Sequence, residues 1–254
     1  MDKIFSKVKP DKLLHIIVRK EDLKTEPYPY VVIKNALEES YYNELESAFP
    51  SNESIAGTSN MENNTRYQIS ANKSFTLPKI WREFVDYHVS ESFYKEFVSL
   101  FGDFFPEKKS WAKTSNIFTR GSGKPKSRKD LQMDCQLAIN SPVSELSSVK
   151  GPHVDNRIEW YAGLFYMRAD QDDSHGGGLE IFKPKDPNME FVNKKEYDLD
   201  LLEKVDEVPY EKNTFVMFLC TKHSLHGVQP RSVTKHSRRF VNVISEFSSG
   251  KKAW

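Results

Sequence analysis

The chain has 254 residues, with 37 Lys or Arg against 36 Asp or Glu, so its formal net charge at pH 7 is +1. This length predicts a single domain, residues 1–254, that buries most of its surface on folding. The balanced charge provides no field that would hold a nucleic acid or an anionic membrane, so we expect neither as a partner. The oligomeric state cannot be read from this pattern.

Cysteine usage and the N-terminus indicate the compartment. Cys135 and Cys220 each lie in an apolar stretch, which predicts buried free thiols in a reducing environment. The apolar patch LLHIIV at 13–18 is interrupted by His15 and is too short for a membrane span or a signal-peptide core. We therefore expect a cytoplasmic protein.

Residues 1–110 are predicted to form a helical N-terminal part. In LEESYYNELESAFP at 37–50, apolar residues recur at steps of three and four until Pro50, which is typical of an amphipathic helix. The segment 77–105 repeats this signal and predicts further helices. The polar interval 51–74 follows neither the helical nor the strand period, and we expect a long loop that borders a functional site.

Residues 111–250 have the composition of strands. Short runs rich in Val, Ile, Phe and Tyr alternate with Gly, Pro, Asn and Asp. The predicted strands are 111–119, 131–139, 158–167, 178–182, 205–210, 213–220, 226–229 and 238–247. Their order after the helices predicts an α+β, mainly β fold, a β-sandwich or barrel-like jelly roll with the helices packed on one sheet.

A histidine and an aspartate, His153 and Asp155, precede the strand at 158–167. Side chains at i and i+2 of a strand point to the same face, so this pair can offer two ligands to one metal ion. The dipeptide spacing alone is a weak signal. A third ligand is available after the strand 213–220, where His226 is followed by Gly227, and His223 competes for that role.

Two adjacent arginines begin the last strand. If Arg238 faces the interior, so do Phe240, Asn242 and Ile244, whereas an inward Arg239 would bring Val241, Val243 and Ser245 with it. A buried arginine needs an anionic partner, which a ligand carboxylate would supply.

Together these residues resemble the Fe(II)/2-oxoglutarate-dependent dioxygenase superfamily, and most closely its prolyl-hydroxylase-like branch. The resemblance lies in HVDN at 153–156, LFYM at 164–167, GGGLEIF at 176–182 and HGVQP at 226–230. Two His and one carboxylate on one face of an iron leave positions open for reactants. The fold implied for residues 111–250 is a double-stranded β-helix catalytic core, of jelly-roll or cupin-like type.

The resemblance also implies roles for single residues. His153, Asp155 and His226 would be the catalytic Fe(II) ligands, and His223 a residue of the turn. Arg238, or else Arg239, would hold the distal carboxylate of 2-oxoglutarate, and a polar residue four positions on, Asn242, favours Arg238.

Other polar side chains have two interpretations. Tyr166 would hydrogen-bond the same carboxylate, or be a core aromatic. Gln136 and Asn140 would face the cofactor or substrate, or be ordinary sheet polarity. The glycines at 176–178 predict close approach of the backbone, and His175 is expected in an exposed loop.

The implied activity is hydroxylation of an unactivated C–H bond, with O2 consumed and 2-oxoglutarate converted to succinate and CO2. An aspartate at position 155 favours hydroxylation over halogenation. The resemblance implies a peptidyl proline or a free amino acid as substrate, within the wider class of small molecules and peptides. We expect Asn156 and Arg157, with Glu159, to contact it. The mixed-charge segment 183–212 is predicted to form a lid.

Two alternatives remain open. One is a cupin-like metal-binding protein that acts as a hydrolase or isomerase. Such sites add further His or Glu ligands and do not require an inward arginine. The other is a non-catalytic module that binds a partner through aromatic residues of the helical part.

Overall fold

The computed structural model describes residues 20–122, 125, 127, 129–189, 196–248 and 252–254. Its α-helices are α2 (Glu39–Ser47), α3 (Asn52–Ala56), α4 (Lys79–His88) and α5 (Glu91–Phe101), with short 3-10 helices at Lys20–Asp22, Ala71–Thr76, Gly102–Phe104, Glu107–Thr114 and Leu199–Leu201. The strands are β1 (Tyr30–Lys34), β2 (Arg66–Ile69), β3 (Ile117–Thr119), β4 (Leu131–Asn140), β5 (Glu159–Tyr166), β6 (Leu179–Pro184), β7 (Leu202–Val208), β8 (Thr214–Leu219), β9 (His226–Val228) and β10 (Arg238–Phe247).

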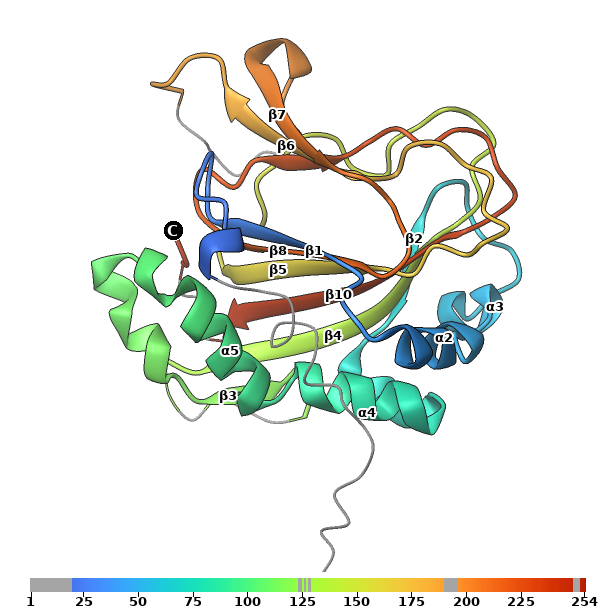
Figure 1. Cartoon of the computed structure of the whole chain (residues 1–254), viewed down its shortest axis with the longest axis horizontal. Coiled ribbons are helices and arrows are strands. Elements are labelled where there is room, and N and C mark those ends of the chain that lie inside the picture. The colour runs from blue at the N-terminus through green and yellow to red at the C-terminus, as the bar shows by residue number, and fades with distance from the viewer. Residues whose placement is uncertain (1–19, 123–124, 126, 128, 190–195, 249–251) are drawn as a thin grey trace, which may run out of the picture.

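Two sheets face each other across an interior (Figure 1). The larger has seven strands in the order β1-β8-β5-β10-β4-β2, with β3 parallel to β4, and the smaller has three in the order β7-β6-β9. One apolar cluster joins them, with Leu179 and Ile181 of the smaller sheet meeting Phe218, Phe240 and Ile244 of the larger. The fold is therefore mixed and mainly β, as predicted.

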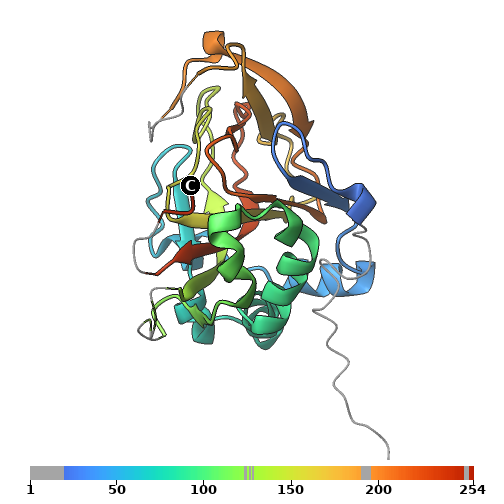
Figure 2. The ribbon, with the colours of Figure 1, turned by 90° about the vertical axis from the view of Figure 1, so that its left-hand side faces the viewer.

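The helices cover the outer face of the larger sheet. Trp81 and Phe84 of α4 and Phe97 of α5 share a buried cluster with Phe165 and Val243 of the sheet. Figures 1 and 2 show the smaller sheet (orange) at one end of the molecule and these helices at the other. The larger sheet therefore contributes apolar side chains to a buried cluster on each of its faces.

The two-residue period of the strands separates these faces. On β10, Val241 and Val243 contact the helices, whereas Phe240 and Ile244 contact the smaller sheet. β10 pairs with β4 on one side and β5 on the other over nearly its whole length. Its register is thus held by two neighbours, which fixes the direction of every side chain on it.

The prediction for residues 1–110 was wrong in two places. This part contributes β1 and β2 to the larger sheet, and the predicted loop 51–74 contains both α3 and β2. β2 has the sequence RYQI and was not recognised because the polar side chains of Arg66 and Gln68 line a cavity. The expected strand 111–119 is also shorter, since Glu107–Thr114 is a 3-10 helix.

Three other expectations can be compared with the structure. Cys135 and Cys220 are buried and free, as predicted. The segment 183–212 contains β7 of the smaller sheet, so it is not a separate insertion throughout, and its residues 190–195 lie outside the described part. The patch at 13–18 also lies outside it, and within the described residues no helix has the length and apolarity needed to cross a membrane.

His88 makes the stability of this packing dependent on pH. It is fully buried, its Nδ1 lies 2.7 Å from the Phe84 carbonyl oxygen, and burial lowers its pKa to about 3. Between the unfolded pKa of about 6.5 and this value, only the unfolded chain binds a proton at this side chain, so stability is lost as the pH falls below about 6.5. We expect urea melts of His88→Gln to show less loss of unfolding free energy between pH 6.5 and 5, by up to about 1.4 kcal/mol per pH unit.

The exposed His175→Gln is the control variant and should follow the wild type. Equal pH dependence in wild type and His88→Gln would show that His88 is not held neutral in the core.

Candidate metal centre

The three predicted metal ligands come together at the mouth of the interior between the sheets. His226 is the first residue of β9, and His153 lies opposite it in the segment before β5. Their backbones exchange two hydrogen bonds, of 2.8 Å from His153 N to His226 O and 2.9 Å in the reverse direction. This bridge joins a loop to the smaller sheet. His153 and Asp155 therefore lie in the segment that precedes strand β5, and neither belongs to a strand.

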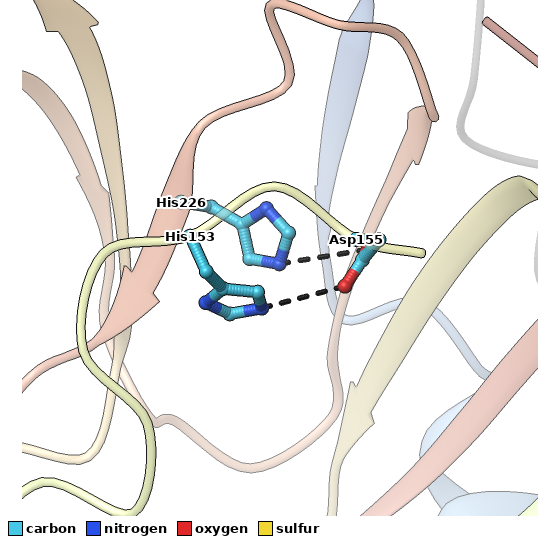
Figure 3. A group of neighbouring side chains, drawn as sticks. All are labelled: His153, Asp155 and His226. Atoms are coloured by element: carbon cyan, nitrogen blue, oxygen red, sulfur yellow. Dashed lines mark ion pairs between the residues drawn. The ribbon is translucent and has the colours of Figure 1, made fainter. Parts of the chain in front are cut away.

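Their ligand atoms converge on one point (Figure 3). Asp155 Oδ1 is 3.3 Å from His153 Nε2, and Asp155 Oδ2 is 3.6 Å from His226 Nε2. One ligand atom from each residue lies within 4.8 Å of the others. Two imidazole nitrogens and a carboxylate in this arrangement fit a divalent transition metal with positions left open on one side.

Hydrogen bonds orient both imidazoles. His153 Nδ1 is 2.8 Å from the Gly151 carbonyl oxygen, and His226 Nδ1 is 2.9 Å from the Ser224 carbonyl oxygen. A carbonyl oxygen only accepts, so each Nδ1 carries a proton and each Nε2 lone pair is free for a metal. The backbone of the two ligand segments thus sets the tautomer that metal binding requires.

The charges of the three side chains also match a metal site. Burial lowers the pKa of His226 to about 4, although the Asp155 carboxylate opposes this shift. Burial raises the pKa of Asp155, but His226 and His153 lower it more, so the pKa of Asp155 lies well below its usual value. A neutral His226 and an ionised Asp155 at pH 7 are the protonation states in which these residues bind metals.

Two further groups adjoin Asp155. Ligand atoms of Glu159 and Cys220 lie within 4.8 Å of an Asp155 oxygen and of each other. Burial, together with the charges of Asp155 and Glu246, raises the pKa of Glu159 to about 8. Burial also raises the pKa of the Cys220 thiol, so this residue is a neutral neighbour of the site.

The centre opens into a cavity of about 450 Å³ between the two sheets. Part of the cavity wall is apolar and consists of Ala162, Leu164, Phe218 and Ile244. Arg238 is one of the polar residues that line it. A volume of this size is in the range of small-molecule sites, about 300–1,000 Å³.

Arg238 is buried, and one of its nitrogens lies among other buried donors that have no acceptor. Its Nε donates to the Gly177 carbonyl oxygen at 2.7 Å and its Nη1 to Asn140 Oδ1 at 3.1 Å. In the described residues, Arg238 Nη2, the Tyr166 hydroxyl and Asn140 Nδ2 are buried and have no partner. Buried polar groups are almost always satisfied, and three donors in one place fit a carboxylate.

Gly177 is the one glycine that this cluster requires. Its φ is +80°, and a Cβ there would lie 3.3 Å from Arg238 Cδ. Glycine adopts this backbone conformation without strain, which lets its carbonyl reach the guanidinium.

Arg239 points to the opposite face of the sheet. Its Nη2 is 2.9 Å from Glu46 Oε1, its Nε donates to the Met167 carbonyl oxygen at 3.1 Å, and its guanidinium lies 5.0 Å from the Phe49 ring. It therefore supports the helices, and the inward arginine is Arg238, together with Phe240, Asn242 and Ile244.

Of the remaining predicted residues, Gln136 reaches the cavity, but its side chain is already hydrogen-bonded to neighbouring side chains. It accepts from Arg66 Nη2 at 2.8 Å and donates to Asp134 Oδ2 at 2.7 Å. His175 and His223 are exposed and are not part of the metal cluster.

Asn156 and Arg157 do not line the cavity, contrary to expectation. Asn156 Oδ1 folds back to accept from Ile158 N at 3.3 Å, and the Arg157 guanidinium lies 5.0 Å from the Trp254 ring. The turn before β5 therefore directs both side chains away, and only Glu159 of this group reaches the interior.

Sequence reasoning missed Arg66, Lys150 and Arg120, which also line the cavity. The alternation of Arg66 and Gln68 with Tyr67 and Ile69 was the available signal for the first of these. Lys150 and Arg120 lie near glycine-rich and serine-rich loops. A loop has no regular period, so the sequence does not indicate where their side chains point.

The arrangement predicts one divalent metal ion per chain. Asp155→Ala should weaken Co(II) or Fe(II) binding by at least about 100-fold, because it removes the only anionic ligand of the three. His223→Ala is the control, because His223 is the other candidate for the distal ligand, and it should bind the metal as the wild type does. Calorimetric titration of metal-free protein under anaerobic conditions measures both. Equal loss in His223→Ala would mean that the distal histidine is misassigned.

Solved structures with a similar fold include a prolyl 4-hydroxylase from Phytophthora capsici, with a TM-score of 0.56 and 13% identity over 97% of this chain and 68% of that chain. A Pseudomonas putida prolyl-4-hydroxylase gives 0.45 and 10% over 85% and 91%, and an α-ketoglutarate-dependent epimerase of nogalamycin biosynthesis gives 0.49 and 11% over 85% and 76%. No protein-family model and no curated protein matches the sequence. The likeness to the Phytophthora prolyl 4-hydroxylase shows a shared fold, which agrees with the resemblance noted in the sequence.

Proposed function

We propose that this protein is an Fe(II)- and 2-oxoglutarate-dependent oxygenase that hydroxylates an unactivated C–H bond, and that its two sheets form a double-stranded β-helix. One observation carries the proposal: a single cavity is lined by the His153, Asp155 and His226 cluster and by Arg238 and Asn140, which carry two of the unsatisfied donors. The first fits Fe(II), and the second fits a carboxylate of 2-oxoglutarate.

Each side chain has a defined task in this proposal. His153 and His226 present neutral Nε2 atoms to the metal, and Asp155 supplies the negative charge. Iron and 2-oxoglutarate, when bound, would supply the oxidising chemistry, with O2 consumed and succinate and CO2 released. Because the carboxylate ligand is present at position 155, the site favours hydroxylation over halogenation.

The donors at the other end would orient the co-substrate. Arg238 Nη2, the Tyr166 hydroxyl and Asn140 Nδ2 are held in place by strands β10, β5 and β4, so little order is lost when a carboxylate binds them. Apolar side chains between the two ends, including Leu164 and Ile244, would exclude water from the reacting bond.

A metal-dependent hydrolase or isomerase is the second candidate, because Glu159 adjoins Asp155 and could act as a further ligand. This alternative leaves the three buried donors at Arg238 without a ligand. It also predicts no dependence on 2-oxoglutarate.

The proposal predicts different effects at two adjacent arginines. Arg238→Gln should weaken 2-oxoglutarate binding by about 10- to 100-fold, because it removes a buried charged donor. Arg239→Gln, on the other face of the sheet, should change it by less than about threefold. Anaerobic titration of the Fe(II) protein with 2-oxoglutarate, followed by the visible charge-transfer band, measures both.

If no band forms in the wild type, the oxygenase proposal is wrong. If Arg239→Gln has the larger effect and is correctly folded, the assignment of the inward arginine to 2-oxoglutarate is wrong.

A further inference from the structure

An arginine and a glutamate in the cavity have no task in the proposed function. Arg66 comes from β2, Glu159 is the first residue of β5, and both line the cavity. Neither forms an ion pair with another described residue within 4.0 Å. A cation and a carboxyl group that share a ligand cavity and lack an ion-pair partner among the described residues are candidates to bind a ligand with charges of both signs.

Apart from Arg238, the neighbouring charged residues that line the cavity have ionic contacts of their own. Arg120 contacts Asp134 Oδ2 at 3.0 Å through Nε and Glu246 Oε2 at 2.8 Å through Nη2. Lys150 Nζ is 4.0 Å from Asp155 Oδ1, so its charge is directed to the metal-ligand carboxylate. These contacts leave Arg66 and Glu159 as the pair available to a substrate.

Arg66 is held in position by a chain of hydrogen bonds. Asp134 Oδ2 accepts from Gln136 Nε2 at 2.7 Å, which turns Gln136 Oε1 toward Arg66 Nη2 at 2.8 Å. The Arg66 guanidinium also lies 5.4 Å from the centre of the Phe240 ring. With its amide turned so that its own hydrogen bonds are satisfied, Asn242 also accepts from Arg66 Nη2, at 3.1 Å. These contacts use two of the five N–H donors of Arg66, so the guanidinium can still bind a carboxylate through the others.

Glu159 stands at the metal end of the same cavity. One of its carboxylate oxygens lies within 4.8 Å of an Asp155 oxygen. Its backbone N–H donates to the Asn156 carbonyl oxygen at 2.8 Å, which fixes the start of β5. An ammonium group at this position can donate a charge-assisted hydrogen bond to a Glu159 carboxylate oxygen.

We infer that the primary substrate is a small zwitterion of the amino-acid class, whose carboxylate binds Arg66 and whose ammonium group binds Glu159. The inference rests on the proposed oxygenase function and names the substrate of the same site. A residue inside a peptide chain offers neither terminal charge, so it would leave both side chains unpaired. The cavity of about 450 Å³ suits a small molecule beside a co-substrate.

The carboxylate at Arg66 has two sources to distinguish, the amino acid and 2-oxoglutarate itself. Arg66 and Arg238 both lie near the Phe240 ring, at 5.4 and 4.6 Å from its centre. We assign 2-oxoglutarate to Arg238 because the unsatisfied buried donors surround that residue, and the substrate to Arg66.

The test uses Fe(II) protein with 2-oxoglutarate and O2 and measures succinate above the rate without substrate. The probes are the twenty free amino acids, the carboxamide and N-acetyl forms of those that stimulate, and a capped prolyl tripeptide. We expect at least one free amino acid to stimulate, with kcat/KM reduced about 10-fold or more by either modification.

Two variants link each charge to its side chain. Arg66→Gln should lower kcat/KM for the free amino acid by about 10- to 100-fold, yet have little further effect on its carboxamide, since the lost interaction is the same. Glu159→Gln should likewise lower kcat/KM for the free amino acid and have little further effect on its N-acetyl form. Arg82→Gln, at an exposed arginine of α4, is the matched control.

The outcomes separate this inference from the function it rests on. If the 2-oxoglutarate charge-transfer band forms but only the capped peptide, or none of the probes, stimulates, the substrate assignment is wrong and the oxygenase proposal stands. If Arg66→Gln weakens 2-oxoglutarate and not the amino acid, Arg66 serves the co-substrate and the inference is also wrong.

Discussion

The site depends on the register of β10. This strand pairs with β4 and β5 at once, so its alternate residues are committed to the helices or to the cavity. As a result, Arg239 contacts Glu46 on the helix side, and Arg238 contacts Asn140 and Gly177 on the cavity side. A shift of one residue would exchange the two arginines and place Val241 and Val243 in the cavity.

A second constraint holds the metal end. The reciprocal backbone hydrogen bonds between His153 and His226 join the loop before β5 to β9, and carbonyl groups then fix both imidazole tautomers. The candidate ligands are therefore placed by main-chain contacts, which depend little on neighbouring side chains. Arg66 and Glu159 line another part of the same cavity and take no part in these contacts.

Much of this could be predicted where a period or a motif exists. The strands from 131 onward follow from alternation along apolar runs. Alternation left Arg238 and Arg239 as alternatives, and the resemblance favoured Arg238 through Asn242. β2 was missed because a strand that lines a polar cavity loses the apolar half of its pattern. Asn156 and Arg157 were misplaced because a turn has no period, and the backbone of residues 156–158 directs both side chains away from the cavity.

The central claim is that one cavity holds a metal at His153, Asp155 and His226 and a 2-oxoglutarate carboxylate at Arg238. The most direct measurement is a crystal structure of the anaerobic complex with Fe(II) and 2-oxoglutarate, with anomalous diffraction at the iron edge. The account predicts one strong anomalous peak among the two Nε2 atoms and the Asp155 carboxylate, with the distal carboxylate of 2-oxoglutarate on Arg238 Nη2 and the Tyr166 hydroxyl. A peak elsewhere, or a distal carboxylate bound at Arg66, would contradict it.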